Sequence, residues 1–271
     1  MRAYDAGIVG AGCVGLATAY QLRDAGLKIA LWEKEKQPAT HQSGHNSGVM
    51  HSGIYYKPGS LKAENCVRGR EELVAFAREH GIAHEVCGKI VLAVEDSELP
   101  ALDNLLLRAH ANGLIQTRKI SSDEIREIEP FCRGVAALFV PYTGIVDYGG
   151  VCRKMVEILR ERKHDVFFDA PVRRIERAEG GFVVWAGKER YFTARLIGCA
   201  GLWADRLAIL AGLKPDVKIV AFRGDYYRLS SSKIRNIVYP LPDPDFPFLG
   251  VHLTRMTDGT IECGPNAVFA F

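Results

Sequence analysis

The first thirty-three residues constrain the fold most, because they hold a glycine-rich turn between two apolar runs. The apolar run at residues 6–9 leads into GAGCVG, which covers residues 10–15. A helical pattern follows at 16–25, and a second apolar run at 29–32 ends at Glu33. Strand, glycine-rich turn, helix, strand and acid in this order predict a dinucleotide-binding βαβ unit.

Each glycine of this turn has a mechanical role. Gly10 permits the tight turn, Gly12 lets a pyrophosphate approach the backbone, and Gly15 lets helix and strand pack closely. The phosphates are expected at the helix N-terminus, where free N–H groups and the helix dipole favour negative charge. Glu33 is expected to accept hydrogen bonds from ribose hydroxyls, which favours FAD or NAD over NADP. This unit alone leaves FAD and NAD open.

A secretory signal peptide is the alternative interpretation, because residues 6–19 are apolar and small. Asp5 interrupts any basic leader, and the pattern continues without a break into the second strand. Both features favour the nucleotide-binding interpretation.

Length and composition indicate two interleaved lobes rather than one domain. The 271 residues are 48% hydrophobic, which is enough for one large core or two moderate ones. The net charge is +3, with charges of both signs spread along the chain and no basic stripe, so nucleic acid is not an expected partner.

Seven scattered cysteines without a C-x-x-C pair argue against a zinc site or a disulfide framework. They favour a reducing compartment, and we expect a cytoplasmic protein. No apolar stretch reaches the length of a membrane span, so any membrane contact, at the inner face, is expected to be peripheral.

A polar segment at residues 34–56 follows the second strand. It contains three of the eight histidines, His41, His45 and His51, among glycines and small hydroxyl residues. Such a segment exposes backbone N–H groups and could wrap an anion or a planar ring. The alternative is a polar surface loop with incidental histidines.

Longer strings make a family resemblance specific. They are EKEK at 33–36, HQSGHNSGVMHSGIYYKPGSLKAENC at 41–66, CGKIVLAVE at 87–95, TGIVDY at 143–148, CAGLWADRL at 199–207, FRGDYYRL at 222–229, FPFLGVHLTRMTDG at 246–259 and GPNAVFAF at 264–271. In these strings the chain resembles the L-2-hydroxyglutarate dehydrogenase or oxidase family, among the D-amino-acid-oxidase-like and glycerol-3-phosphate-dehydrogenase-like flavoproteins. Members of that family are longer, so we expect this chain to lack the C-terminal third.

The resemblance implies FAD and an α/β fold, in which a Rossmann-like FAD-binding domain of the glutathione-reductase type is interleaved with an antiparallel-sheet substrate domain. We expect residues 1–86 and 145–215 to form the FAD-binding domain, and residues 87–144 and 216–271 to form an incomplete substrate domain.

The turn and the resemblance together assign the cofactor-binding residues Gly10, Gly12, Gly15, Glu33, Lys34, Ser43, His45, Asn46, Ser47, Gly48, Val172, Ala200, Gly201 and Asp205. Val172 matches the strand position that meets the adenine, although an ordinary buried strand residue is the alternative. His45 falls where distant relatives attach FAD covalently, but a noncovalent contact is expected here.

The implied chemistry needs a base and cations. Hydride leaves C2 of a 2-hydroxy acid for the flavin while a base removes the hydroxyl proton. A histidine suits the base, and either His51 or His252 is a candidate, with a structural histidine as the alternative.

Arginine's planar fork suits carboxylates, so Arg223 and Arg255 are the predicted carboxylate-binding residues. Tyr55 and Tyr56 are predicted hydroxyl donors. A surface ion pair or ring packing is the alternative for each of these four.

The expected reaction is oxidation of L-2-hydroxyglutarate, a small 2-hydroxy dicarboxylate, to 2-oxoglutarate, with a quinone or oxygen as electron acceptor. Two alternatives stay open: another FAD-dependent amine, hydroxy-acid or glycerol-phosphate oxidoreductase, and an inactive member that binds only nucleotide. An NAD-dependent dehydrogenase is disfavoured, because it leaves the histidine-rich segment unexplained.

Periodicity predicts the remaining elements. Helices are expected at 71–81, 99–112, from 121 or 122 to Pro130, and at 150–162, and strands at 89–94, 135–140, 165–168, 172–177, 181–185, 190–192, 196–201, 223–229, 248–254 and 260–264. The last two strands are expected to pair around Asp258-Gly259, after a rigid loop at 240–247.

Overall fold

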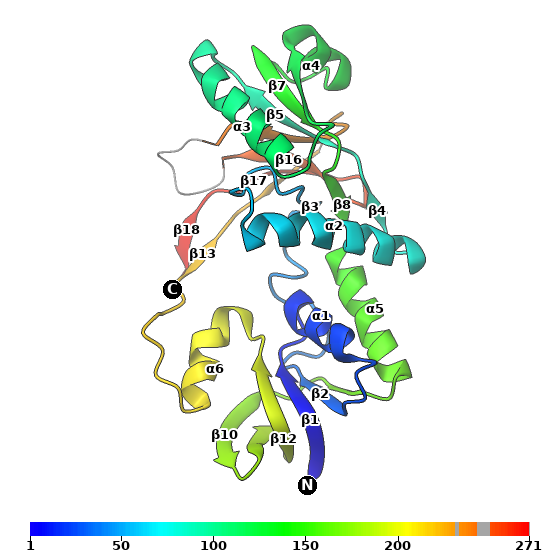
Figure 1. The fold of residues 1–271 in the computed structure, drawn as a ribbon, viewed down its shortest axis with the longest axis vertical. Helices are drawn as coiled ribbons and strands as arrows, with labels where there is room; N and C mark the ends of the chain where they lie inside the picture. Colours follow the sequence, from blue (N-terminus) through cyan, green and yellow to red (C-terminus); the bar gives the residue numbers. More distant parts are fainter. Residues whose placement is uncertain (231–232, 243–249, 271) are drawn as a thin grey trace. The chain divides into compact units, whose positions relative to one another are not determined.

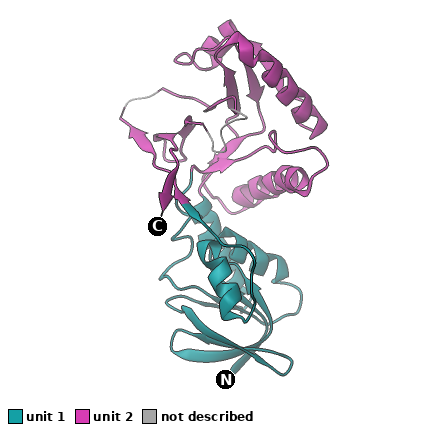
Figure 2. Cartoon of the chain, turned by 90° about the vertical axis from the view of Figure 1, so that its left-hand side faces the viewer, with its two compact units in different colours: residues 1–46, 148–221 teal, residues 47–147, 222–271 magenta. Residues whose placement is uncertain are grey.

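The computed structural model describes residues 1–230, 233–242 and 250–270 (Figure 1). The chain forms two compact units, each built from two stretches of sequence (Figure 2). Unit 1 comprises residues 1–46 and 148–221, and unit 2 comprises residues 47–147 and 222–271.

Unit 1 is a six-stranded sheet with helices on both faces. The strand order is β10 (Val172–Ala178), β11 (Gly181–Ala186), β12 (Glu189–Gly198), β1 (Arg2–Val9), β2 (Ile29–Trp32) and β9 (Asp165–Phe167). β12, β1, β2 and β9 are parallel, whereas β10 and β11 form an antiparallel extension. This is the Rossmann-like arrangement that the opening βαβ unit predicts. β12 is one continuous strand where two short strands were predicted.

The two faces of this sheet have separate cores, because successive strand residues point to opposite sides. In β2, Ile29 and Leu31 pack against α1 (Cys13–Leu22) and α5 (Tyr148–Glu161), which lie side by side in Figure 1. Ala30 and Trp32 face the other way, into a core that Leu207 and Leu210 of α6 (Ala204–Leu210) border. Both faces are covered, so β2 is a continuous apolar run rather than an alternating one.

Unit 2 contains a seven-stranded sheet in the order β14 (Tyr227–Leu229), β17 (Ile261–Gly264), β16 (His252–Arg255), β15 (Ile237–Pro240), β5 (Lys89–Ala93), β7 (Ala136–Val140) and β6 (Arg118–Ser121). The pairings are antiparallel, as predicted for the substrate lobe, except that β15 runs parallel to β5. The predicted hairpin around Asp258-Gly259 is confirmed, with Gly259 at a φ of 82°.

The helices of unit 2 are α2 (Leu61–Glu79), α3 (Leu99–Ala111) and α4 (Ser122–Ile128). α3 packs on one face of the sheet and α4 on the other. Ser121 is the N-cap of α4: its Oγ accepts the Glu124 N–H, and the Glu124 carboxylate accepts the Ser121 N–H. α2 begins ten residues before its predicted start at 71, because Ser60 caps a polar first half that carries no apolar stripe.

The predicted domain boundaries differ from these units at residues 47–86, which belong to unit 2 rather than to the unit with the glycine-rich turn. The reason is a three-stranded sheet, in which β3 (Val49–Met50) and β4 (His84–Glu85) both pair with β8 (Gly144–Val146). A partner so distant in sequence is not visible in a local pattern. The other boundaries shift by only a few residues, to 147/148 and 221/222.

Three more short elements are η2 (Gly201–Trp203), which precedes α6, and β13 (Ala221–Arg223) and β18 (Val268–Ala270), which pair with each other. A further 3₁₀ turn, η1 (Asp96–Glu98), precedes α3. Most of the predicted loop at 240–247 and the start of the predicted strand at 248–254 lie outside the described residues.

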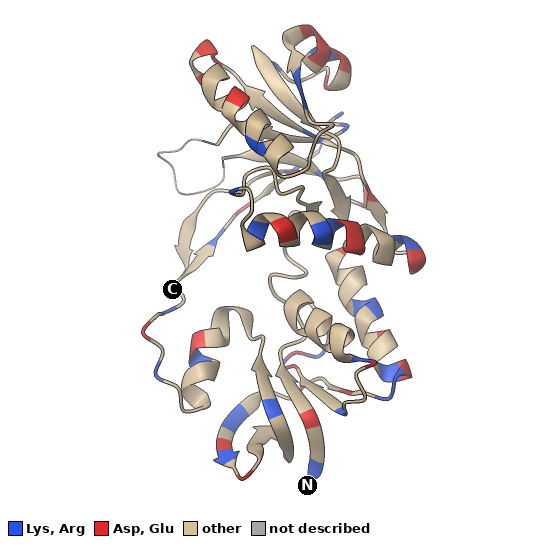
Figure 3. Cartoon of the chain, in the orientation of Figure 1, with Lys and Arg blue, Asp and Glu red and all other residues tan. Residues whose placement is uncertain are grey.

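Residues of both charge signs are scattered over both units (Figure 3). All seven cysteines are described, and none of them forms a disulfide. Within residues 1–230, 233–242 and 250–270, no helix is long and apolar enough to cross a membrane, and no cluster of ligand-type side chains could hold a metal ion.

Candidate functional site

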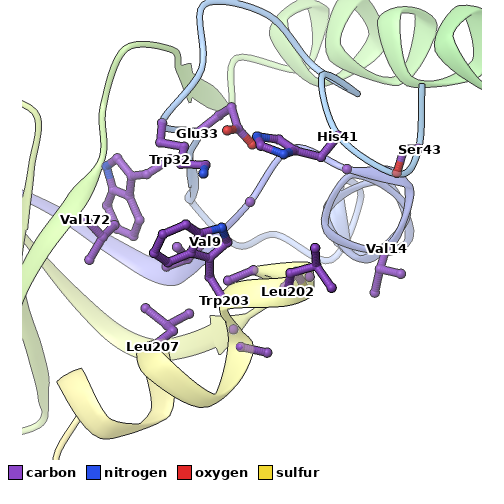
Figure 4. A pocket seen from close by; sticks show the side chains of 18 of the residues that line it. Val9, Val14, Trp32, Glu33, His41, Ser43, Val172, Leu202, Trp203 and Leu207 are labelled. Carbon is purple, nitrogen blue, oxygen red and sulfur yellow. The ribbon is translucent and has the colours of Figure 1, made fainter. Parts of the chain in front are cut away.

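A pocket of about 710 Å³ lies in unit 1 at the carboxyl ends of β1, β2 and β12 (Figure 4). Ligands of open parallel sheets bind at this edge. Its lining comes from the glycine-rich turn, the end of β2, the coil at 39–43, residues 171–172 and the segment 198–210. We call it the unit 1 pocket.

Two glycines of the glycine-rich turn occupy positions where a side chain would collide with the backbone. Gly10 has a φ of 110°, and a Cβ there would lie 2.4 Å from the Cys199 carbonyl oxygen. A Cβ on Gly15 would lie 1.9 Å from the Gly10 carbonyl oxygen, so Gly15 allows α1 to pack on the turn. Gly12, the N-cap of α1, lines the pocket, and a Cβ there would lie 3.0 Å from Ser43 Oγ.

Glu33 connects the end of β2 to this turn. Its buried carboxylate accepts the Ala11 N–H at 2.6 Å through Oε2 and the Glu35 N–H at 3.0 Å through Oε1. Each carboxylate oxygen has a further lone pair, so Glu33 can also accept from a ribose hydroxyl. A negative charge at this position disfavours a phosphate on that ribose.

The other side of the pocket is apolar. Val172, Trp203 and Leu207 border it in Figure 4, and the Lys34 Nζ lies 4.5 Å from the centroid of the Trp203 ring. An aromatic ring beside an aliphatic wall offers a stacking surface for a flat base. Trp203 and Arg206, which also line the pocket, were not predicted, although both lie inside the string CAGLWADRL.

Eight of the predicted cofactor-binding residues line the unit 1 pocket: Gly10, Gly12, Glu33, Lys34, Ser43, Val172, Ala200 and Gly201. Ser43 also fixes the turn, because its Oγ accepts the Cys13 N–H at 2.9 Å. His41 and Gln42 line the pocket as well, although neither was predicted to bind the cofactor.

Six predicted cofactor residues within the described ranges do not contribute to this lining. Gly15 lies behind the turn, and Ser47 and Gly48 belong to unit 2. His45 and Asn46 bond back to backbone carbonyls at 41–43, so they shape the coil. Asp205 accepts the Ile219 and Arg206 N–H groups, and these bonds lower its pKa.

Unit 2 contains a second cluster of polar side chains around Lys89, the first residue of β5. The Lys89 side chain is completely buried. Its Nζ donates to the Tyr55 hydroxyl at 3.2 Å and lies 4.4 Å and 4.8 Å from the ring centroids of Tyr55 and Tyr239. Burial lowers the pKa of Lys89 to about 7. Lys89 was not predicted as a site residue, because a lysine at the start of an apolar strand is typical of an ordinary strand end.

His252 stacks on Tyr239, with ring centroids 4.0 Å apart, and is 2% exposed. Its Nδ1 lies 3.0 Å from the Gly250 carbonyl oxygen, which can only accept, so Nδ1 carries the proton. Nε2 is then a bare acceptor, and this buried atom has no partner among the described residues. Burial lowers the pKa of His252, so the ring is neutral near pH 7.

His51 lies near the same tyrosine, with its ring edge-on to Tyr239 at 6.5 Å. Burial, followed by the charges of Lys89 and His252, lowers its pKa to about 4. The structure therefore brings both predicted base candidates to one aromatic ring, together with Tyr55.

The other three predicted catalytic residues lie outside this cluster. Arg223 is exposed and forms an ion pair with Asp225 at 2.8 Å. Arg255 forms an ion pair with Glu85 at 2.6 Å and donates to the Arg235 carbonyl oxygen. Tyr56 is 37% exposed, and its carbonyl oxygen accepts from Asn112. Both arginines already have carboxylate partners, which is the alternative that their sequence context left open.

Comparison with known proteins agrees with this architecture. Residues 5–271 match the family described as FAD dependent oxidoreductase. L-2-hydroxyglutarate dehydrogenase of Indibacter alkaliphilus is 47% identical over 97% of this chain and 68% of its own length. The Escherichia coli protein of the same name is 44% identical over 99% of this chain and 65% of its own length. The chain thus spans about two thirds of the length of these relatives.

Among solved structures, the reduced L-α-glycerophosphate oxidase of Mycoplasma pneumoniae with FAD bound superposes with a TM-score of 0.91 at 27% identity. This match covers 100% of the chain and 73% of the oxidase. The glycine-rich turn, the pocket at the strand ends and these similarities lead to one conclusion: the chain belongs to the FAD dependent oxidoreductase family and, within it, to the family of L-2-hydroxyglutarate dehydrogenases.

Proposed function

We propose that the chain catalyses the FAD-dependent oxidation of L-2-hydroxyglutarate to 2-oxoglutarate. The observation that supports this most is the 47% identity, over nearly the whole chain, to a relative named L-2-hydroxyglutarate dehydrogenase. The unit 1 pocket and the buried polar cluster of unit 2 supply groups suited to the two halves of this reaction.

The residues of the unit 1 pocket fit FAD. A Cβ-free position at Gly12 beside the N-terminus of α1 accommodates a pyrophosphate, and Glu33 suits ribose hydroxyls. Val172, Trp203 and Leu207 offer an apolar wall to the adenine. When bound, the flavin supplies the acceptor for the hydride that leaves C2 of the substrate.

The proton of the substrate hydroxyl requires a base, and the geometry favours His252 over His51. His252 has an acceptor nitrogen fixed by the bond from Nδ1 to the Gly250 carbonyl oxygen. Because Nε2 is buried and has no partner among the described residues, a hydroxyl group that reached it would satisfy it. Arg223 and Arg255 remain candidates for the substrate carboxylates only if they exchange their present partners.

The electron acceptor in this proposal is a quinone or oxygen. A cytoplasmic location, with at most peripheral contact with the inner face of a membrane, accords with seven cysteines, all of them described and none in a disulfide. The proposed partners are therefore a small dicarboxylate and an electron acceptor, without nucleic acid.

Dye reduction by the FAD-reconstituted chain tests the function. L-2-hydroxyglutarate should reduce the dye and yield 2-oxoglutarate, whereas the D-enantiomer, glycine and L-proline should not. L-α-glycerophosphate is the essential comparison, because the oxidase named for it has the same fold at a TM-score of 0.91. A yellow protein that oxidises only glycerophosphate contradicts the substrate assignment, and a colourless protein that binds only adenine nucleotides contradicts the activity.

A further inference from the structure

Lys89 is a buried cation without a counter-charge in the part of the chain that the structure describes. No carboxylate within the described residues forms an ion pair with its ammonium, and its hydrogen-bond partner is the Tyr55 hydroxyl. The aromatic faces of Tyr55 and Tyr239 also lie beside the ammonium. A buried ammonium is costly unless an anion compensates it, so this position is stable as a charged group only when an anion lies nearby.

Tyr55 is the route by which that charge can reach a ligand. Its oxygen accepts from Lys89 Nζ, so its own O–H proton remains to be donated. Lys89 is completely buried, whereas Tyr55 as a residue retains some exposed surface, so a ligand would approach the pair from the Tyr55 side. A hydroxyl that accepts from an ammonium becomes a stronger donor, because bonds in a chain polarise one another.

We propose that Lys89 and Tyr55 form a carboxylate subsite: the Tyr55 hydroxyl donates to a carboxylate of the substrate, and the buried ammonium supplies the positive charge behind it. Lys89 is then a positioning residue, and Tyr55 is the group that touches the ligand. This inference rests on the proposed oxidation of a dicarboxylate. It assigns substrate binding to a cation other than Arg223 and Arg255, whose carboxylate partners are already within the chain.

The neighbouring groups suit this role. His252 presents its bare Nε2 acceptor from β16, and it shares Tyr239 with Lys89. A carboxylate held by Tyr55 would therefore lie in the same buried cluster as the acceptor proposed for the adjacent hydroxyl. One cluster thus holds a donor for an anion and an acceptor for an alcohol, as a 2-hydroxy acid requires.

Binding of glutarate, a dicarboxylate that cannot be oxidised at C2, tests the subsite without turnover. We expect Lys89→Met and Tyr55→Phe in the FAD-reconstituted chain to raise the Kd for glutarate by about 10- to 100-fold in calorimetry, because a charge-assisted bond is lost. Lys62→Met, an exposed position on α2, and Tyr227→Phe, 77% exposed, are matched controls that should bind as the wild type does.

The pH dependence separates an electrostatic role from a structural one. The ammonium of free Lys89 loses its proton near pH 7, and a bound carboxylate would raise its pKa. The Kd of the wild type should therefore rise between pH 6 and 8.5, and that of Lys89→Met should stay flat. The other titratable groups that face Lys89 have pKa values shifted away from this range. The pKa is lowered for His51 and His252, and it is raised for Tyr55, Cys66 and Tyr239.

The experiments distinguish failure of the carboxylate subsite from failure of the proposed oxidation. Methionine replaces a buried charge with an apolar chain of similar length, so Lys89→Met should melt no lower than the wild type. If Lys89→Met unfolds, the glutarate Kd of Tyr55→Phe decides whether the subsite exists. Unchanged glutarate affinity in both variants, or no glutarate binding by the wild type, overturns the subsite. Lys89-dependent glutarate binding in a chain that does not oxidise L-2-hydroxyglutarate retains the subsite and rejects only the proposed reaction.

Discussion

The Glu33 carboxylate accepts the Ala11 N–H at 2.6 Å, so the acid at the end of β2 holds the backbone of the glycine-rich turn in place. This bond makes the residue expected to contact ribose a structural part of the turn as well. The two functions are coupled, because one carboxylate both accepts the Ala11 N–H and belongs to a residue that lines the pocket.

Replacing Glu33 should therefore affect both stability and nucleotide binding. In Glu33→Gln one oxygen becomes a donor that cannot accept a backbone N–H, which should cost about 1.5–3 kcal/mol of unfolding free energy. The Kd for FAD, from quenching of flavin fluorescence, should rise by about tenfold or more. Glu179→Gln, in the exposed turn between β10 and β11, is the matched control. A variant that melts normally yet binds FAD weakly would show that Glu33 acts only on the ligand.

Substitutions at the glycines of the turn should have different effects: one on stability, the other on FAD binding. Gly15→Ala places a Cβ against the Gly10 carbonyl oxygen, so we expect a loss of about 1–3 kcal/mol in denaturant unfolding. Gly12→Ala should melt near the wild type but bind FAD more weakly, because Gly12 lines the pocket and its Cβ would meet only Ser43 Oγ among the described residues. Gly69→Ala, in α2 with open space around it, should stabilise the chain by about 0.5–1 kcal/mol. Equal destabilisation at positions 12 and 15 would contradict this distinction.

Cys13 should be the most reactive thiol at neutral pH. It lines the unit 1 pocket, and a hydrogen bond with Cys152, 3.4 Å away, is the main cause that lowers its pKa to about 7. Burial raises the pKa of Cys66, Cys87, Cys132 and Cys199. Because the thiolate reacts, alkylation of Cys13 should accelerate as the pH rises from 6 to 8.

Peptide mass mapping after brief iodoacetamide treatment measures this order of reaction. FAD should slow the labelling of Cys13, because the pocket that it lines would be filled. Cys13→Ser, which removes the thiol at the same site, should leave the slow labelling of the other cysteines unchanged. Earlier modification of any cysteine other than Cys13 in the wild type would refute the prediction.

His252→Gln should abolish most of the turnover while the protein stays yellow. Loss of a general base costs about 10² to 10⁴ in kcat, and the glutamine can still occupy the space beside Tyr239. Dye reduction by L-2-hydroxyglutarate under saturating substrate measures the effect, with the flavin spectrum as the loading control. His51→Gln should lose less than His252→Gln does. The reverse order would identify His51 as the base.

The sequence by itself determined the nucleotide half of this protein. The glycine spacing, the two apolar runs and Glu33 are local features of the sequence. Together they specify one local backbone conformation, the strand–turn–helix–strand unit. The family and its cofactor also followed from sequence, through strings such as HQSGHNSG and CAGLWADRL. Helix positions were predicted well where an apolar stripe or a cap was present, as in α3 and α4.

Only the tertiary structure decided which part of the histidine-rich segment lies with the glycine-rich turn and which part belongs to the other unit. Residues up to 46 stay with the turn, whereas β3 pairs with β8 and carries His51 into unit 2. Tertiary structure also decided the partners of the charged residues: Arg223 and Arg255 form ion pairs with carboxylates of the chain, and Lys89 donates to a hydroxyl and lies beside two aromatic rings. The physical reason is that strand pairing and side-chain burial depend on residues far apart along the chain, whereas a motif records only its own neighbours.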